Sequence, residues 1–228
     1  MKIDLLVPTR GRPERFRRMV NSAQDRADAP ENLFVWLYVD EGDDCYSGIE
    51  ASREPKLLNP LVGPRLEIMS DLWNRLYEVS HGDILWHGND DMVFETQGWD
   101  TKVREAFAKH PDQIACVYGD DGNVHDSVAV ASFTSRKAAD ARGWFVPPYF
   151  KSLYNDLWLT HVYRKLDRLV YLPDVMIRHE HHSIPKYAHL LDDTYRERFC
   201  YDSESTQVWL KHEPEVEEHA TLLRGLME

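Results

Sequence analysis

The chain has 228 residues, a formal net charge of −12 and a hydrophobic fraction of 43%, which is ordinary for a globular protein with a full core. The acidic balance argues against broad binding of nucleic-acid phosphates, and no apolar run approaches the length needed to span a membrane. The scattered Cys45, Cys116 and Cys200 favour reduced thiols in a cytoplasmic protein. The polar start of the chain predicts no signal peptide.

The first forty residues predict a β-α-β unit. Residues 3–7 form a short apolar run, residues 14–24 place apolar side chains at helical spacing, and residues 33–39 are nearly all apolar. This order predicts a parallel pair of strands joined by a right-handed crossover. A ligand crevice is expected above the carboxyl ends of these strands.

The loop after the first strand carries no Gly-rich nucleotide fingerprint. Residues 9–12 lack the Gly-x-Gly-x-x-Gly pattern and the phosphate-loop lysine. A nucleotide would therefore be held by strand-end carboxylates and backbone groups. Asp40, at the end of the second strand, is suited to accept a hydrogen bond from a base or a ribose hydroxyl, and an ordinary loop acid is an equally good interpretation.

The stretch from Gly82 to Phe94 is the centre of the prediction. Residues 84–86 are a short apolar run after a glycine, typical of a buried strand, and they lead directly into Asn89, Asp90 and Asp91. Adjacent carboxylates at a strand end favour a hard divalent cation. An Asn-Asp turn is an equally good interpretation of these three residues alone.

The remaining segments continue an alternation of helices and strands. Residues 45–62 look irregular because Pro55 and Pro60 break regular structure. The aromatic loop at residues 144–150 is predicted to pack against the sheet rather than to serve as a substrate platform. Apolar spacing predicts helices at residues 66–80, 98–109, 135–142 (closed by Gly143) and 155–166, and strands at residues 114–118, 128–133, 169–172 and 175–177.

The last strand is followed by three histidines, His179, His181 and His182. Imidazole is a common metal ligand, and one ligand among the three is the favoured interpretation. In the acidic tail, Trp209 and Leu210 are expected to dock a helix on the body of the protein. The leucines at positions 222, 223 and 226 suggest a terminal amphipathic helix.

Taken in order, these pieces resemble the family 2 glycosyltransferases of the GT-A fold, over residues 3–182. No single motif identifies the family, and the resemblance rests on the motifs occurring in the family's order. The matching positions are residues 7–15, residues 38–42 with Asp40, Asn74, residues 89–91 as an Asp-x-Asp motif, Asn155 with Asp156, and His179.

The resemblance implies the architecture. We expect a single α/β domain with the GT-A fold, in which a Rossmann-like mixed sheet is flanked by helices. This glycosyltransferase domain would span residues 1–182. Residues 183–228 would form a C-terminal helical extension packed on it.

The resemblance also implies the activity and the roles of individual residues. A sugar would move, with inversion, from a nucleoside-diphosphate sugar, with a UDP-sugar favoured, to a hydroxyl of a carbohydrate or a modified nucleobase. Asp156 would act as general base, and Asp91 and His179 would hold Mn²⁺ or Mg²⁺. The donor would be bound by Pro8, Thr9, Arg10, Arg12, Asp40, Asn74 and Asp90.

Three competing functions stay open, and two departures from the family pattern suggest one of them, a binding module without turnover. Asn89 replaces the first acid of the Asp-x-Asp motif, and Asn155 replaces the glutamate before the base. A metal-dependent phosphoesterase would use Asp90, Asp91 and the histidines, but it needs more acids for two ions. A sugar-nucleotide-binding module without turnover is the second competing function. The third is a transferase acting on hydroxymethylated pyrimidines of phage DNA.

Overall fold

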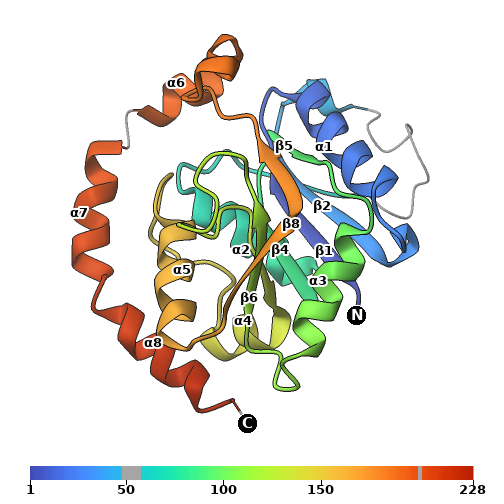
Figure 1. The fold of residues 1–228 in the computed structure, drawn as a ribbon. Coiled ribbons are helices and arrows are strands. Elements are labelled where there is room, and N and C mark those ends of the chain that lie inside the picture. Colours follow the sequence, from blue (N-terminus) through green and yellow to red (C-terminus); the bar gives the residue numbers. More distant parts are fainter. Residues whose placement is uncertain (48–57, 200–201, 228) are drawn as a thin grey trace.

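The computed structural model describes residues 1–47, 58–199 and 202–227. In this part of the chain, one mixed sheet of eight strands has the order β3-β2-β1-β4-β7-β6-β8-β5, and helices cover both of its faces (Figure 1). The strands are β1 (Ile3–Pro8), β2 (Leu33–Asp40), β3 (Leu58–Gly63), β4 (Ile84–His87), β5 (Met92–Phe94), β6 (Cys116–Asp120), β7 (Phe133–Ser135) and β8 (Leu169–His179).

Helices are present in all the segments where the apolar spacing predicts them, with bounds that differ by a few residues. The α-helices are α1 (Pro13–Asp25), α2 (Met69–Val79), α3 (Trp99–Ala108), α4 (Arg136–Arg142), α5 (Asn155–Lys165), α6 (Asp193–Phe199), α7 (Asp202–His212) and α8 (Glu215–Arg224). Short 3-10 helices are η1 (Pro30–Asn32), η2 (Asp44–Tyr46) and η4 (Pro185–Leu190). The predicted single α/β domain with a mixed sheet is confirmed.

The parallel centre of the sheet is built by β1, β2 and β4. Strand β1 pairs in parallel with β2 on one side and with β4 on the other. All six of its residues are buried, as expected for a strand covered on both faces. Successive side chains enter two different cores: Leu5 joins the one that includes α1 and α3, and Leu6 joins the one that includes α2, α4, α5 and α8.

The segment at residues 45–62, predicted to be irregular, contains strand β3. Residues 48–57, which include the expected breaker Pro55, lie outside the described part of the chain. Strand β3 pairs in parallel with β2, with Pro60 opposite Leu37. Because β3 is the edge of the sheet, Pro60 can lack an N–H on the outward side without losing a hydrogen bond, so proline is compatible with this strand.

Four predicted strands have different bounds in the structure. Residues 128–132 are not a strand, and the backbone of Ala131 adopts φ +53°, which ends any extended run before β7. Strand β6 begins at Cys116, two residues later than predicted. The two predicted strands 169–172 and 175–177 are one strand, β8, whose register shift beside Gly119 accommodates the intervening residues.

The C-terminal residues are helical and pack on the body. Helix α8 contacts α4 and α5, and α7 and α8 run along the outer side of α5 (Figure 1). Trp209 is buried as predicted, whereas Leu210 is 61% exposed, so the prediction that it docks the helix was wrong. Phe145 and Phe150 are fully buried, so the aromatic loop packs against the sheet as predicted. Among the described helices, none has the length and apolar character required to cross a membrane.

Candidate active site

A cleft lies at the carboxyl ends of the three parallel strands β1, β2 and β4. Together with the open solvent at its mouth it spans about 920 Å³. Strand β1 lies between β2 and β4, and such a position is where open α/β sheets bind ligands. The predicted residues that line the cleft are Pro8, Thr9, Arg10, Arg12, Asp40, Asp90 and Asp91.

The turn from β4 into the acidic motif depends on a glycine. A side chain on Gly88 would meet the Trp86 ring at 2.2 Å, which no residue with a Cβ can tolerate. The Trp73 indole donates to the Gly88 carbonyl at 3.2 Å and holds this turn against α2. The glycine and the indole therefore place Asn89, Asp90 and Asp91 at the cleft.

Asp90 is held by the loop that follows β1. Its carboxylate accepts a hydrogen bond from the Thr9 hydroxyl at 2.8 Å and one from Arg12 at 3.3 Å. The hydroxyl of Tyr46 lies 2.5 Å from Thr9 Oγ1 and accepts the backbone N–H of Arg12 at 2.9 Å. Burial raises the pKa of Asp90, an effect that Arg12 opposes and Asp91 reinforces.

Asp91 faces His179 because β5 pairs antiparallel with the end of β8, which sets Met92 opposite His179. Asp91 Oδ1 lies 3.4 Å from His179 Nε2, and Tyr195 donates its hydroxyl to Asp91 Oδ2. Burial acts to raise the pKa of Asp91, but His179 and the Tyr195 hydroxyl hold it well below its usual range. Asp91 is therefore the ionised member of the pair and Asp90 the more readily protonated one.

Asp91 and His179 fit two positions of a divalent cation. Asp91 Oδ1 is shielded from solvent and accepts no hydrogen bond of normal geometry from the described residues. Two ligands on adjacent positions of an octahedral ion with bonds of about 2.1 Å lie roughly 3 Å apart, close to the observed 3.4 Å. Within residues 1–47, 58–199 and 202–227, no group of three or more His, Cys, Asp or Glu side chains could hold a metal ion. Substrate oxygens or water would complete the coordination.

Of the three clustered histidines, His179 is the one beside the acidic motif. The ring of His181 lies 2.7 Å from the Ser183 hydroxyl through Nδ1, and the ring of His182 packs on the Tyr195 ring with centroids 4.2 Å apart. The placement of His179 agrees with the prediction of one ligand among the three, and its role as a ligand stays a prediction.

Arg10 and Asp40 form an ion pair across the floor of the cleft. Arg10 Nε lies 2.5 Å from Asp40 Oδ2, so the two strand ends that were predicted to bind the nucleotide meet as expected for neighbouring parallel strands. Arg10 also lies 3.6 Å from Glu197, which pairs with Arg65.

Three predicted residues, Asn74, Asp156 and His179, do not line the cleft, although His179 contacts the lining residue Asp91. The Asn74 amide accepts the backbone N–H groups of Phe145 and Val146 and donates to the Val146 carbonyl, so it anchors the aromatic loop to α2. Asp156 lies in the first turn of α5, half-buried, and accepts the N–H of Leu157 at 2.8 Å.

The face of α5 that carries Asp156 is tied to the end of β4. Thr160, one turn on, donates to the Asp156 carbonyl and accepts the N–H of Ala129. The same loop meets β4, where His87 donates its N–H to the Ser132 carbonyl at 2.8 Å. The neighbouring Asn155 is buried and accepts a hydrogen bond from Ser70, so the residue that departs from the family pattern joins α5 to α2.

Sequence reasoning missed several residues of the cleft. Tyr46 follows β2 in a short 3-10 helix and contacts the cleft residue Thr9, and Lys151 comes from the end of the aromatic loop, while Thr194, Tyr195 and Glu197 come from the C-terminal extension. No motif marks any of them in the sequence. They approach the cleft only because distant segments of the chain fold back over the strand ends.

The arginines near the N-terminus do not form an unneutralised basic face. Each of these side chains lies within ion-pair distance of at least one carboxylate, and most of those carboxylates come from distant segments of the chain. The pairs are Arg10 with Asp40 and Glu197, Arg12 with Asp90 and Asp192, Arg15 with Asp192, Arg17 with Glu14, and Arg18 with Glu180.

No family model matches the sequence, and no curated protein matches it. Solved structures do match, and they define the fold as that of the GT-A glycosyltransferases. S. aureus TarS matches with a TM-score of 0.63 and 12% identity over 83% of this chain and 39% of the TarS chain.

Two further structures match at similar levels. Mannosyltransferase PcManGT from Pyrobaculum calidifontis has a TM-score of 0.65 and 15% identity, covering 78% of this chain and 56% of that one. GalNAc-T7 has a TM-score of 0.66 and 10% identity, covering 78% of this chain and 44% of that one. The chain thus spans 39% to 56% of the length of these three structures.

Proposed function

We propose that this chain is a glycosyltransferase that moves a sugar from a nucleoside-diphosphate sugar to an acceptor hydroxyl. The observation that carries the proposal is the cleft at the ends of β1, β2 and β4, which gathers Thr9, Arg12, Asp40 and Asp91 from three separate motifs in a chain with the GT-A fold.

The ligands present in the matching structures support the type of donor. A TarS 1–349 structure is in complex with UDP-GlcNAc. The PcManGT structure contains GDP-Man and Mn²⁺, and the GalNAc-T7 structure contains UDP, GalNAc and Mn²⁺. We propose a UDP-sugar as the donor, and Mn²⁺ in preference to Mg²⁺ because Mn²⁺ accepts a mixed oxygen and nitrogen shell.

The predicted site residues, in the cleft and beside it, each have a role in this chemistry. Asp40 accepts hydrogen bonds from the base or the ribose, and Arg12 supplies charge-assisted hydrogen bonds to phosphate oxygens. Asp91 and His179 would hold the cation, which neutralises the charge that develops on the leaving diphosphate. Asp156 takes the proton of the acceptor hydroxyl on the opposite face of the sugar, which gives inversion at the anomeric carbon.

Calorimetric titration of UDP, GDP, CDP and TDP, each with and without Mn²⁺, tests the proposal. We expect Mn²⁺-dependent binding of one of the four, most strongly UDP, followed by donor hydrolysis or transfer to an acceptor. A failure of all four to bind would refute the nucleotide-sugar function. Tight binding with no donor hydrolysis and no transfer would instead favour the binding module.

A further inference from the structure

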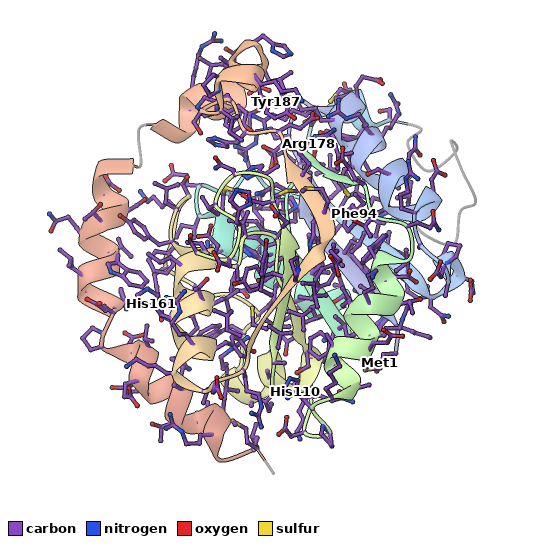
Figure 2. The ribbon with its side chains drawn as sticks, viewed as in Figure 1. Met1, Phe94, His110, His161, Arg178 and Tyr187 are labelled. Atoms are coloured by element: carbon purple, nitrogen blue, oxygen red, sulfur yellow. The ribbon has the colours of Figure 1, made fainter. Side chains whose placement is uncertain are left out.

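The C-terminal extension reaches back over the cleft. We call residues 190–197 the strap. Thr194 donates its hydroxyl to the Arg10 carbonyl at 3.1 Å, and Arg15 donates to the Leu190 carbonyl at 2.5 Å. The preceding 3-10 helix η4 carries Tyr187, which Figure 2 shows beyond Arg178 of β8 at the same end of the molecule. The strap is thus attached to the loop and helix that follow β1.

Asp192 of the strap makes a two-pronged ion pair with Arg12. Arg12 Nε lies 2.8 Å from Asp192 Oδ2, and Arg12 Nη2 lies 2.6 Å from Oδ1. Arg15 lies 3.3 Å from the same carboxylate. A guanidinium recognises carboxylate and phosphate oxygens with the same fork geometry. Asp192 therefore occupies the donor groups of Arg12 that a phosphate would use.

Tyr195 and Glu197 of the strap line the cleft, whereas Asp192 contacts it through Arg12. Glu197 lies 2.5 Å from Arg65 and 3.6 Å from Arg10, which both line the cleft. Tyr195 donates its hydroxyl to Asp91, and its ring lies under the Arg12 guanidinium, 4.0 Å from Cζ to the ring centroid. The strap thus places carboxylates on the cleft cations and a hydroxyl on the acidic motif.

Arg12 is a buried cation that faces more than one carboxylate. Its side chain is 8% exposed and already lies 3.3 Å from Asp90. One guanidinium therefore faces two carboxylates, of which Asp90 belongs to the strand-end motifs and Asp192 to the strap. Displacing Asp192 would free two donor groups of Arg12, a residue that lines the cleft, and would leave Asp90 beside it.

We propose that Asp192 is an internal stand-in for the diphosphate of the donor, so that the strap and the diphosphate compete for Arg12. This inference rests on the proposed function. In this arrangement Asp192 covers the donor groups of Arg12, and the strap must shift for the phosphates to bind there. The sequence of the tail shows no motif for such a role, because the pairing joins residues 180 positions apart.

The test compares Asp192→Asn with Asp193→Asn. Both changes remove one carboxylate from the strap at constant size, but Asp193 is exposed and pairs with Arg196 on the surface of α6. UDP and inorganic pyrophosphate are titrated calorimetrically into the full chain without added divalent metal. We expect Asp192→Asn to lower the Kd for both probes about 5- to 10-fold, and Asp193→Asn to leave it unchanged.

A double-mutant cycle ties the effect to Arg12. In an Arg12→Gln background, adding Asp192→Asn should change neither Kd, and thermal unfolding of each variant verifies that it is folded. Equal Kd values for Asp192→Asn and Asp193→Asn would overturn the inference, as would weaker binding by Asp192→Asn. Tighter pyrophosphate binding with no UDP binding would uphold the strap and refute the nucleotide function instead.

Discussion

Asp156 is the proposed general base, which takes the proton of the acceptor hydroxyl. It lies half-buried in the first turn of α5, where an acid also interacts favourably with the helix dipole. The tie from Thr160 through Ala129 to the end of β4 brings this turn to the same end of the sheet as the acidic motif. This position is compatible with a base that acts on an acceptor bound beside the nucleotide cleft.

We expect Asp156→Asn to abolish sugar transfer and to leave nucleotide binding near normal. A general base contributes about 10²–10⁴-fold to a rate, and Asp156 does not line the cleft. Transfer is measured by release of the nucleoside diphosphate, and binding by calorimetry. A variant that kept most of its turnover would refute the assignment. Asp167→Asn, beyond the opposite end of α5, serves as the control.

Asp91 is expected to account for the metal dependence of nucleotide binding. Asp91→Ala should remove the part of the nucleotide affinity that depends on Mn²⁺, because it deletes the ionised carboxylate beside His179. Affinity without metal should change less. The measurement is the ratio of UDP Kd values with and without Mn²⁺, and the exposed Asp44→Ala is the control. A wild-type ratio near one would count against the metal assignment.

A buried histidine predicts how stability depends on pH. His87 is buried, its ring contacts Trp73 and Phe145, and neither ring nitrogen has a hydrogen-bond partner among the described residues. Burial lowers its pKa from 6.5 to about 3. Between these values the unfolded chain binds one more proton than the folded chain. Stability is therefore complete above pH 6.5 and falls as the pH decreases, by up to about 1.4 kcal/mol per pH unit.

Urea unfolding from about pH 7.5 to about pH 4.5 measures this dependence. His87→Leu removes the titrating group, so its stability should fall less steeply with acid than that of the wild type. The exposed His189→Gln should retain the wild-type slope. Parallel pH profiles for His87→Leu and the wild type would show that His87 does not contribute.

At the scale of elements, helices α7 and α8 are part of one of the two apolar cores rather than an appendage beside it. Val216, Ala220 and Leu223 of α8 belong to the same apolar cluster as Leu6 of β1 and Leu85 of β4. The ring of Trp209 in α7 packs in this cluster as well. The domain boundary at residue 182 stays a prediction from the sequence. In the structure, residues on both sides of it pack in one apolar cluster.

Adjacent leucines of α8 give a matched test of this packing. Leu223 is fully buried and Leu222 is 45% exposed. We expect Leu223→Ala to lower the free energy of unfolding by about 2–4 kcal/mol, and Leu222→Ala to change it by less than about 0.5 kcal/mol. Urea unfolding measures both. Similar small losses for the two variants would mean that α8 does not dock as observed.

At the scale of the whole molecule, charge decides between acceptors. The net charge is −12, and the arginines that could have formed a basic face are paired with carboxylates such as Asp192 and Glu180. Phosphate-backbone binding needs unpaired cations on a surface. Within the proposed function, we therefore favour a carbohydrate or small-molecule hydroxyl over a nucleobase within DNA as the acceptor.

We accordingly expect no binding of duplex DNA at about 150 mM salt, with a Kd weaker than about 10⁻⁴ M. Fluorescence anisotropy of a labelled duplex containing hydroxymethylcytosine measures it, with an unmodified duplex as the control. Salt-dependent binding in the micromolar range would reinstate DNA as the acceptor.

The sequence carried enough information for the fold and for the strand-end residues of the cleft. Apolar runs such as residues 33–39 mark buried parallel strands, and the carboxyl ends of parallel strands necessarily meet at one edge, so Thr9, Asp40 and Asp91 could be grouped without coordinates. Strand β3 was missed because an edge strand accepts Pro60, and the bounds of β7 were wrong because Ala131 breaks a run that looks extended.

What the tertiary structure decided is which groups face one another across long separations in the chain. The local sequence around Asn74 does not show that its amide anchors the aromatic loop. Nor does the sequence of the tail show that Asp192 pairs with Arg12 and Tyr195 with Asp91. Periodicity reports only the local burial of a segment. Such pairings depend on how layers stack and on where the chain returns, and only packing of the whole molecule sets that.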